Sequence, residues 1–466
     1  MAEQAKFLTG SLFKHVSVMS LTASVGLMAI FLVDFVDMIF ISMLGKSELA
    51  AAVGYAGAIL FFTTSFGIGM SIAAGALVAR ALGAGDEEEA KRKATHALIY
   101  GFVFGAIFAA LVWLNLGFFV TLLGASGDTH VLAVHYLQII VPTLPFLMIG
   151  MVGGAILRAH GDAKRAMMAT IWGGAVNAVL DPILIFGLDL ELTGAALASV
   201  AARLTIAAVS LLPIIKFYGG FVKPEARDLM LDLRPVFALA FPAILTQLAT
   251  PIGQAYVTRA MAEYGEAAVA GMAIVGRLTP IAFGVIFALS GAVGPIIGQN
   301  FGAGQHDRVR GGFKAGVTFV GIFVVFMTAL LFVIRAPIAD IFVAEGITRE
   351  LVYLFCGPLA LVFFFNGLLF VANASFNNLG HPYYSTWLNW GRHTIGTIPF
   401  VILGAMWFGA SGVLIGQAVG GVIFGVLSAV LAWRVMSKVE SGAADVSKPA
   451  PFAREARRMQ HGFWKR

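Results

Sequence analysis

The sequence predicts an all-α polytopic membrane protein in which twelve transmembrane helices form two pseudo-symmetric six-helix bundles. Three observations support this prediction. Of the 466 residues, 59% are hydrophobic and only 12% are charged, whereas a soluble domain carries roughly 25% charged residues. Apolar runs of membrane-spanning length follow one another along almost the whole chain, and the second half repeats short patterns of the first.

The apolar runs suit helices, because a spanning helix needs roughly 20 mostly apolar residues. They are continuous rather than alternating, which favours helices over the strands of a membrane barrel. The first run follows Lys6 and Lys14 without a cleavage site, so we expect an uncleaved span. We place the twelve runs at 16–43, 50–80, 94–116, 132–157, 165–187, 193–215, 235–262, 268–297, 313–335, 351–376, 384–407 and 411–434.

Basic residues orient these spans, because Lys and Arg concentrate in cytoplasmic loops. Four alternate connections are basic, and the connections between them hold few cations. The connection between the tenth and eleventh spans holds only His381 and does not bear on the orientation. The basic set is Lys91, Arg92, Lys93, Arg158, Lys164, Arg165, Lys216, Lys223, Arg227, Arg234, Arg308, Arg310 and Lys314, followed by the tail from Lys438 to Arg466. We therefore expect a multi-pass protein of the bacterial inner membrane with both termini in the cytoplasm, and we do not interpret the net charge of +6 as nucleic-acid binding.

Four segments follow from this pattern. We expect an N-terminal six-helix lobe at 1–215 and a C-terminal six-helix lobe at 235–436. The longest polar break between spans, 216–234, is interpreted as a cytoplasmic linker. Residues 437–466 are basic and rich in Ser and Pro, and we expect them to be disordered.

The two halves repeat each other in the same order. Ala79–Gly85 resembles Gly298–Gly304, and Ile156–Gly161 resembles Ser375–Gly380, each at an offset of 219 residues. Six spans per repeat preserve the orientation, so the repeat is parallel, and transporters of this kind bind substrate near the midplane between or within the halves. No Gly-Lys-Ser/Thr follows the Gly-Ala-Gly turns, which favours helix C-caps over phosphate-binding loops.

The fifth span contains three residues that are unusual in an apolar helix. Asn177 and Asp181 lie four apart, so a helix places them on one face. Pro182 cannot donate a hydrogen bond to the carbonyl of Ala178, which predicts a kink there. A charge in the bilayer centre costs roughly 3 kcal/mol or more, so we expect a proton or cation site. The alternative is a neutral carboxyl group that only helps the helices to pack.

The first span carries Asp34 and Asp37, three residues apart and on one face. Two carboxylates that close resist joint ionisation, which is how a proton carrier could be poised near neutral pH. The alternative is that one acid faces the cleft while the other pairs with a neighbouring helix. The sixth span carries one further candidate, Ser199, one helical turn past Gly194–Leu197. A lone serine in such a helix usually bonds its own backbone.

Within its apolar spans the second half carries amides and a phenol rather than acids. Candidate cleft residues are Gln247, Gln254, Tyr256, Asn366 and Asn373, although such groups are more often interhelical contacts. The repeat offset places Tyr256 near the counterpart of Asp37 and Phe400 near that of Asp181. Ion coupling is therefore expected in the first half. Arg392 and His393 have no acid near them in sequence, and we assign them no role.

These motifs together resemble those of the multidrug and toxic compound extrusion (MATE) family over residues 10–435. The resemblance rests on Asp37 before Met43-Leu-Gly45, on Gly298–Gly304, and on Asn177 with Asp181-Pro182 before Phe186-Gly187. It implies the MATE/MOP-like fold and most resembles the DinF-type branch. In that branch the matching positions imply an ion or proton site at Asp37, Asn177, Asp181 and Ser199, and for that reason we favour Asp37 over Asp34.

Two departures from relatives bear on the mechanism. NorM-type relatives carry acids in spans seven and ten, but here span seven has only Glu263 near its end and span ten has none. That argues against a sodium site in the second lobe. Some relatives bend span one at a proline, and none occurs here between Lys14 and Gly45.

The resemblance implies a secondary antiporter that exports amphipathic, often cationic compounds in exchange for protons or sodium. We expect no other cofactor, no metal site except for sodium at Asp37, Asn177 and Asp181, no nucleic-acid partner, and a monomer in the lipid bilayer. An enzyme is disfavoured, because no metal-ligand spacing or paired catalytic motif is found. The alternative is a lipid-linked oligosaccharide flippase of the same superfamily, which Arg203, Arg277 and Arg392 leave open.

Overall fold

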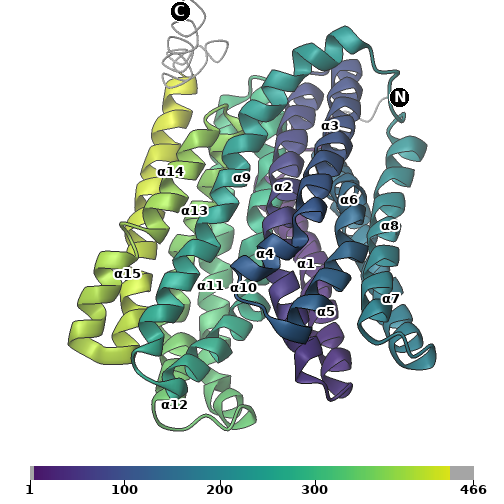
Figure 1. Ribbon diagram of the computed structural model, residues 1–466. Helices are drawn as coiled ribbons and strands as arrows, with labels where there is room; N and C mark the ends of the chain where they lie inside the picture. The colour runs from purple at the N-terminus through teal and green to yellow at the C-terminus, as the bar shows by residue number, and fades with distance from the viewer. Residues whose placement is uncertain (1–4, 441–466) are drawn as a thin grey trace, which may run out of the picture.

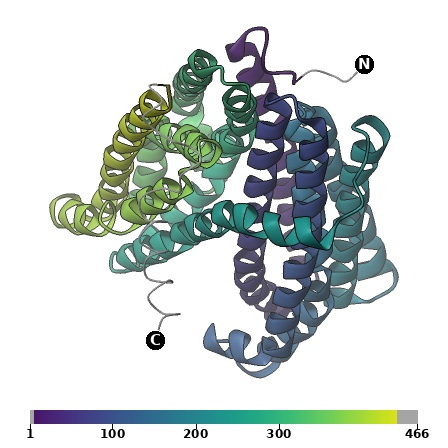
Figure 2. The ribbon, with the colours of Figure 1, turned by 90° about the horizontal axis from the view of Figure 1, so that it is seen from above.

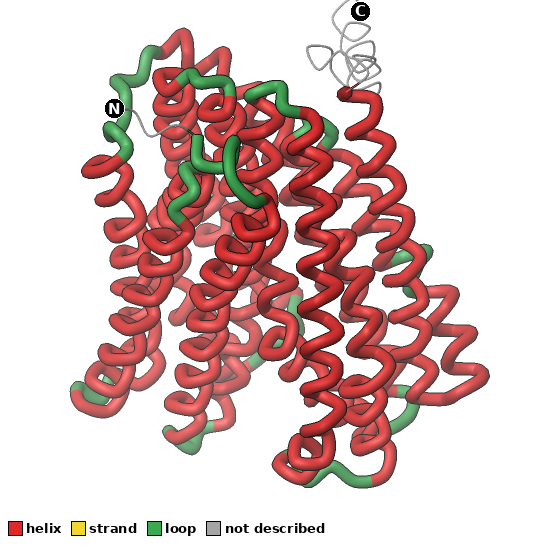
Figure 3. Tube along the Cα trace, turned by 180° about the vertical axis from the view of Figure 1, so that it is seen from behind, coloured by secondary structure: helices red, strands yellow, loops and turns green. Residues whose placement is uncertain are grey.

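The structure is a computed structural model that describes residues 5–440. Within this range the chain is helical, with short connecting loops and no strand (Figure 3). Eleven helical stretches of the described chain are long and apolar enough to cross a membrane. The last of them, Pro382–Glu440, holds two crossings because the backbone turns at Gly409 (φ 59°, ψ −138°). The prediction of twelve helical spans is therefore confirmed.

The N-terminal lobe contains the first six crossings. Its fourth crossing is made of α5 and α6, joined by a 3-10 turn at Val141–Thr143. The short α4, which precedes this crossing, was not predicted from the sequence. The helices of this lobe are α1 (Leu12–Met43), α2 (Ser47–Gly83), α3 (Glu87–Leu114), α4 (Leu116–Leu122), α5 (Gly127–Ile140), α6 (Leu144–Ala159), α7 (Ala163–Pro182) and α8 (Glu191–Phe217).

The C-terminal lobe contains the other six crossings and lies beside the first lobe (Figures 1 and 2). Its tenth crossing is made of α12 and α13, which are joined by a π-helical turn at Phe355–Leu359. The helices of this lobe are α9 (Ala226–Ala262), α10 (Glu266–Gly302), α11 (His306–Ile341), α12 (Gly346–Leu354), α13 (Ala360–Asn378), α14 (Pro382–His393) and α15 (Ile398–Glu440).

The polar segments between and after the lobes are more helical than the sequence suggested. Because α9 begins at Ala226, the segment 216–234 is a loop only between Phe217 and Ala226. Residues 437–440 of the predicted tail continue α15 as helix, and 441–466 lie outside the described residues. Both described ends lie at the same end of the bundle (Figure 1), which we call the terminal face.

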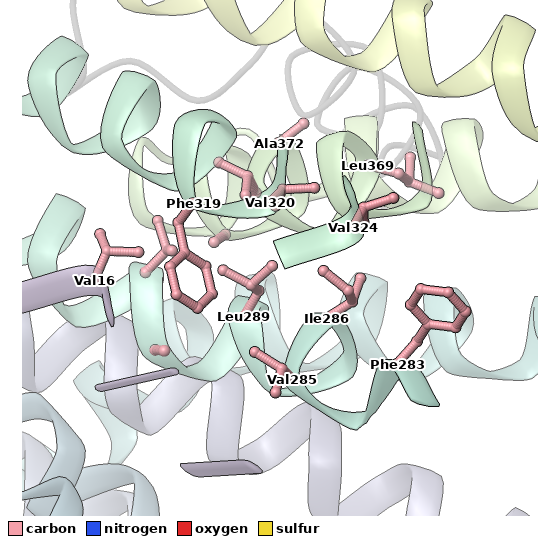
Figure 4. Packing of buried hydrophobic residues seen from close by; sticks show 14 of the residues in the cluster. Val16, Phe283, Val285, Ile286, Leu289, Phe319, Val320, Val324, Leu369 and Ala372 are labelled. Carbon is pink, nitrogen blue, oxygen red and sulfur yellow. The ribbon is translucent and has the colours of Figure 1, made fainter. Parts of the chain in front are cut away.

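Helix α1 packs against both lobes. Its first half lies in the C-terminal lobe, where Val16 joins the buried cluster that contains Leu289 and Phe319 (Figure 4). Its second half lies in the N-terminal lobe, where Ile41 is buried in a separate apolar cluster. One continuous helix therefore carries Asp37 in one lobe and is anchored in the other.

The lobes are joined by hydrogen bonds at the terminal face. Arg80 of α2 donates to the carbonyls of Asn377 and Asn378 at the end of α13, each at 2.8 Å. Gln299 of α10 donates to the carbonyl of Ala159 at the end of α6, at 2.7 Å. Arg80 and Gln299 occupy equivalent positions of the repeat, so each lobe supplies a donor that caps a helix of the other.

Candidate functional site

The site begins with the backbone around Pro182. Asp181 is fully buried and Asn177 is 5% exposed, both on the inner face of α7. After Pro182 the chain continues as a π-helical turn, Ile183–Gly187, instead of the simple kink that the sequence suggested. Proline removes one backbone donor, and a wider turn accommodates that loss. Turns of this type inside helices are frequent at functional sites.

A glycine of α8 packs directly against the backbone of this turn. A Cβ added at Gly194 would lie 2.7 Å from the carbonyl carbon of Leu184 and 2.8 Å from the nitrogen of Ile185. Only glycine allows α8 to approach the π-helical backbone this closely. The contact fixes the position of the segment that follows Asp181.

Two carboxyl groups and one amide meet inside the N-terminal lobe. The Asn177 Nδ2 donates to Asp181 Oδ2 at 2.8 Å. The carboxyl group of Asp37 on α1 lies in hydrogen-bonding contact with that of Asp181. The Oδ1 atoms of both acids are buried, and neither has a hydrogen-bond donor in the described chain. Two carboxylates in contact repel each other, so a single proton or cation between them stabilises the pair.

A tyrosine that sequence reasoning missed lies beside this group. Tyr136 of α5 is 7% exposed, and its hydroxyl makes a hydrogen-bonding contact with Ser199 of α8. Asp37 and Asp181 are close enough to act on it electrostatically. A lone phenol within an apolar span was the signal that could have indicated it, because a buried tyrosine hydroxyl usually requires a partner.

Asp34 and Arg203 are placed differently from the carboxyl pair. Asp34 is exposed, and its carboxyl group has no hydrogen-bond partner among residues 5–440. Arg203 donates to the carbonyl of Ile140 and to the hydroxyl of Thr143, each at 3.0 Å. It therefore holds the joint between α5 and α6.

No hydrogen bond of the described chain joins any two of the five cleft candidates of the C-terminal lobe. Gln254 is exposed and accepts from Gln417 at 3.2 Å, whereas Asn373 is buried and accepts from Asn389 at 3.2 Å. Gln247 is half-buried on α9, and Tyr256 packs against an apolar cluster. The Oδ1 atom of Asn366 is buried without a hydrogen-bond partner in the described part of the chain.

A duplicated bundle of twelve membrane helices with a buried carboxyl pair in one lobe defines a polytopic membrane protein of the transporter class. The chain belongs to the MatE family, whose sequence pattern matches residues 23–183 and 242–403. The two matched ranges correspond to the two repeats. Membership of the MATE transporters, expected from the motifs, is therefore confirmed.

Several characterised proteins are similar along most of their length. A FAD transporter of Shewanella oneidensis is 29% identical over 442 residues, which cover 92% of this chain and 96% of the relative. The multidrug export protein MepA of Staphylococcus aureus is 25% identical over 348 residues, which cover 73% of this chain and 75% of that protein. The relatives are thus transporters with different named substrates.

Solved structures share the fold. A point mutant of the Vibrio cholerae MATE transporter VcmN superposes with a TM-score of 0.87 at 24% identity, covering 93% of this chain and 98% of that one. A MOP superfamily transporter from Pyrococcus furiosus, described as having a binding pocket of reverse polarity, also gives 0.87, at 21% identity and with 94% and 99% coverage.

Proposed function

We propose that this protein is a secondary antiporter that exports amphipathic, often cationic organic compounds from the cytoplasm in exchange for a proton or sodium ion. The observation that carries the proposal is the contact between the carboxyl groups of Asp37 and Asp181, with Asn177 as their amide donor. A buried pair of acids that needs one cation, inside a transporter lobe, is suited to ion coupling. No other cofactor enters the proposal.

The carboxyl pair can change the arrangement of the lobes through α1. When the proton leaves, the two carboxylates repel each other, and this repulsion decreases if Asp37 moves away from Asp181. Asp37 lies on the same helix as Val16, which is packed in the C-terminal lobe. Ion binding therefore favours one arrangement of the lobes, and substrate binding favours the other. Moving one charge through 100 mV supplies about 2.3 kcal/mol for this cycle.

We place the terminal face in the cytoplasm of a bacterial cell, with the protein in the inner membrane as a monomer. The basic loops support this orientation, as do the two ends of the described chain at one face. The cross-lobe hydrogen bonds of Arg80 and Gln299 lie at this face. In this arrangement the cytoplasmic route is closed at the terminal face.

The substrate is a small amphipathic molecule. The relatives include a multidrug export protein and a FAD transporter, both of which are named as transporters of small molecules. A flippase for lipid-linked oligosaccharides is a weaker candidate, because the relatives include a multidrug export protein and a FAD transporter, and because Arg203, one of the three arginines that left it open, is engaged by Ile140 and Thr143.

The proposal is tested by transport in proteoliposomes with proton and sodium gradients imposed separately. We expect a fluorescent organic cation such as ethidium to accumulate only when one of the gradients is present. A lipid-moving protein would redistribute a fluorescent lipid and leave ethidium where it is. Ethidium movement that is equal with and without both gradients would contradict antiport.

A further inference from the structure

The C-terminal lobe contains an arginine that the proposed ion coupling does not use. We propose that Arg392, together with His393 and Asn366, binds the phosphate or carboxylate group of an organic-anion substrate. This inference rests on the proposed transport function, and it adds a class of substrate that carries a negative charge. The following observations support it.

Arg392 of α14 and Asn366 of α13 border α15, and His393, the next residue of α14, lies against α9. A Cβ built at Gly421 of α15 would lie 3.4 Å from Asn366 Oδ1, 3.9 Å from Arg392 Nε and 4.0 Å from Arg392 Nη2. The amide and the guanidinium therefore border the same point. His393 is 5% exposed and lies against Gly253 of α9, whose added Cβ would meet its ring at 2.2 Å.

The polar atoms of this cluster have no partners in the described chain. Both ring nitrogens of His393 and the Oδ1 atom of Asn366 are buried without a hydrogen bond. The guanidinium group of Arg392, which is half-buried, makes no ion pair and no hydrogen bond with residues 5–440. A polar atom that is buried without a partner is costly, so His393 and Asn366 mark a candidate functional site beside this arginine. A bound oxyanion would supply the missing acceptors.

The depth of the cluster argues for a substrate group and against a lipid headgroup. Helix α14 begins with Pro382 near the terminal face, and Arg392 follows ten residues later. At 1.5 Å per residue this is about 15 Å into the membrane, which is roughly half of a hydrocarbon core about 30 Å thick. Headgroup phosphates lie at the surface of the core, whereas substrate sites of duplicated transporters lie near the midplane.

The repeat places this cluster where the other lobe has its acids. With an offset of 218 residues, Gln417 is the counterpart of Ser199, and Gln417 donates to Gln254, which lies close to the counterpart of Asp37. At the same offset the counterpart of Asn177 is Ile395, which Arg392 and His393 precede by three and two residues. The corresponding helix of the repeat thus carries Asn177 and Asp181 in one lobe and Arg392 and His393 in the other.

The chemistry of the cluster fits an oxyanion. A guanidinium group offers planar paired donors that match phosphate and carboxylate. A neutral imidazole adds one further N–H donor. Because the acids of the N-terminal lobe are separated from this cluster by the lobe boundary, an organic anion can bind here while the carboxyl pair still exchanges its ion.

The test compares riboflavin with riboflavin 5′-phosphate, which differ only in the phosphate group. Binding to the purified full-length protein in phosphatidylcholine nanodiscs is followed by flavin fluorescence. We expect the phosphorylated flavin to bind more tightly, and Arg392→Gln to weaken its binding by about tenfold or more while riboflavin binding stays unchanged. Arg392→Lys should restore part of the difference. Equal weakening of both flavins, or of neither, would overturn the proposal.

Controls separate this result from misfolding and from lipid binding. Arg335→Gln removes another half-buried arginine of the same lobe, whose guanidinium packs on Phe332 at 4.1 Å, and should leave both flavins unaffected. Inorganic phosphate should compete only with the phosphorylated flavin. If phosphatidylglycerol in the nanodiscs abolishes the preference, the site belongs to a lipid headgroup and the proposal fails. Ethidium transport by Arg392→Gln reports separately on the antiport function.

Discussion

Gly83 of α2 and Gly302 of α10 each lie directly on the backbone of the other repeat. A Cβ added at Gly83 would come within 2.0 Å of the carbonyl oxygen of Gln299, and a Cβ added at Gly302 within 2.0 Å of that of Arg80. The two glycines are 219 residues apart, so the pseudo-symmetry axis passes between them. The lobes therefore meet at the terminal face by direct backbone contact, which no side chain larger than hydrogen allows.

Replacing Gly83 by alanine should weaken this closure. Backbone atoms at 2.0 Å cannot give way as a flexible side chain would, so α2 and α10 must separate. Overpacking of this kind typically costs about 1–3 kcal/mol. We expect Gly83→Ala to lower the Tm in detergent. The matched control is Gly57→Ala in the same helix, where an added Cβ meets nothing within 4 Å; a similar loss in both variants would contradict the explanation.

Arg80 should hold the terminal face closed. Its two hydrogen bonds to the carbonyls of Asn377 and Asn378 cross from one lobe to the other. We expect Arg80→Gln to increase hydrogen–deuterium exchange at the end of α13 and at residues 299–304. Arg310→Gln serves as the control, because Arg310 bonds Ser437 within the C-terminal lobe. Unchanged exchange in Arg80→Gln would show that the closure does not depend on this side chain.

Gly194→Ala should impair the site without touching a polar residue. The added methyl group would strike Leu184 and Ile185 and displace the turn after Asp181. We expect ion-driven ethidium transport to fall about tenfold or more, since small misplacements at a site are costly. Gly187→Ala tests the same turn from a position where the nearest atom is 3.9 Å from the added Cβ. It should retain transport, and equal loss in both would disprove the role of the close contact.

Asp162 should make folding stability sensitive to acid. Burial by itself would raise the pKa of its carboxyl group, but hydrogen bonds from the Tyr218 hydroxyl and from Arg165 outweigh it, so the pKa lies below the ordinary value of 3.8. A lowered pKa stabilises the fold above the ordinary value, and this contribution is lost as the pH falls through the lowered one. We expect roughly 1 kcal/mol from these bonds.

The measurement compares the Tm of the unmodified protein with that of Asp162→Asn. Asparagine keeps an oxygen that can cap α7, so the comparison isolates the charge. The difference in Tm should be constant between pH 7 and pH 5 and should shrink below about pH 4. A difference that grows on acidification would mean that the carboxyl group is not stabilised as a carboxylate.

The architecture was largely predictable from the sequence, because each crossing is a long apolar run and the basic residues mark alternate loops. The predicted number of twelve spans is correct although Pro382–Glu440 is one helical stretch, because the backbone turns at Gly409 and divides it into two crossings. The extra helix α4 was missed, because a seven-residue, largely apolar segment beside a long span carries no boundary signal. The early start of α9 at Ala226 was missed for the opposite reason, since its first two turns carry the charged residues Arg227, Asp228 and Asp232.

The site was predictable only in part. Asn177 and Asp181 could be paired from their spacing along one helix, and the structure shows their hydrogen bond. The contact of Asp37 with Asp181 joins residues 144 positions apart, so only the family resemblance indicated it. The surroundings of Tyr136 and of Arg392 are determined by which helices pack together, and the local sequence does not contain that information. The π-helical turn depends on tertiary contact with Gly194.

Ion-gradient-driven transport by Asp37→Asn is the most direct measurement. Asparagine keeps the size of the side chain but cannot release a proton or hold a cation as a carboxylate does. In proteoliposomes the variant should bind ethidium, yet its accumulation should be the same with and without an ion gradient, whereas Asp128→Asn, an exposed acid at the start of α5, should behave as the unmodified protein. Undiminished gradient-driven accumulation by Asp37→Asn would contradict the assignment of coupling to the Asp37–Asp181 pair.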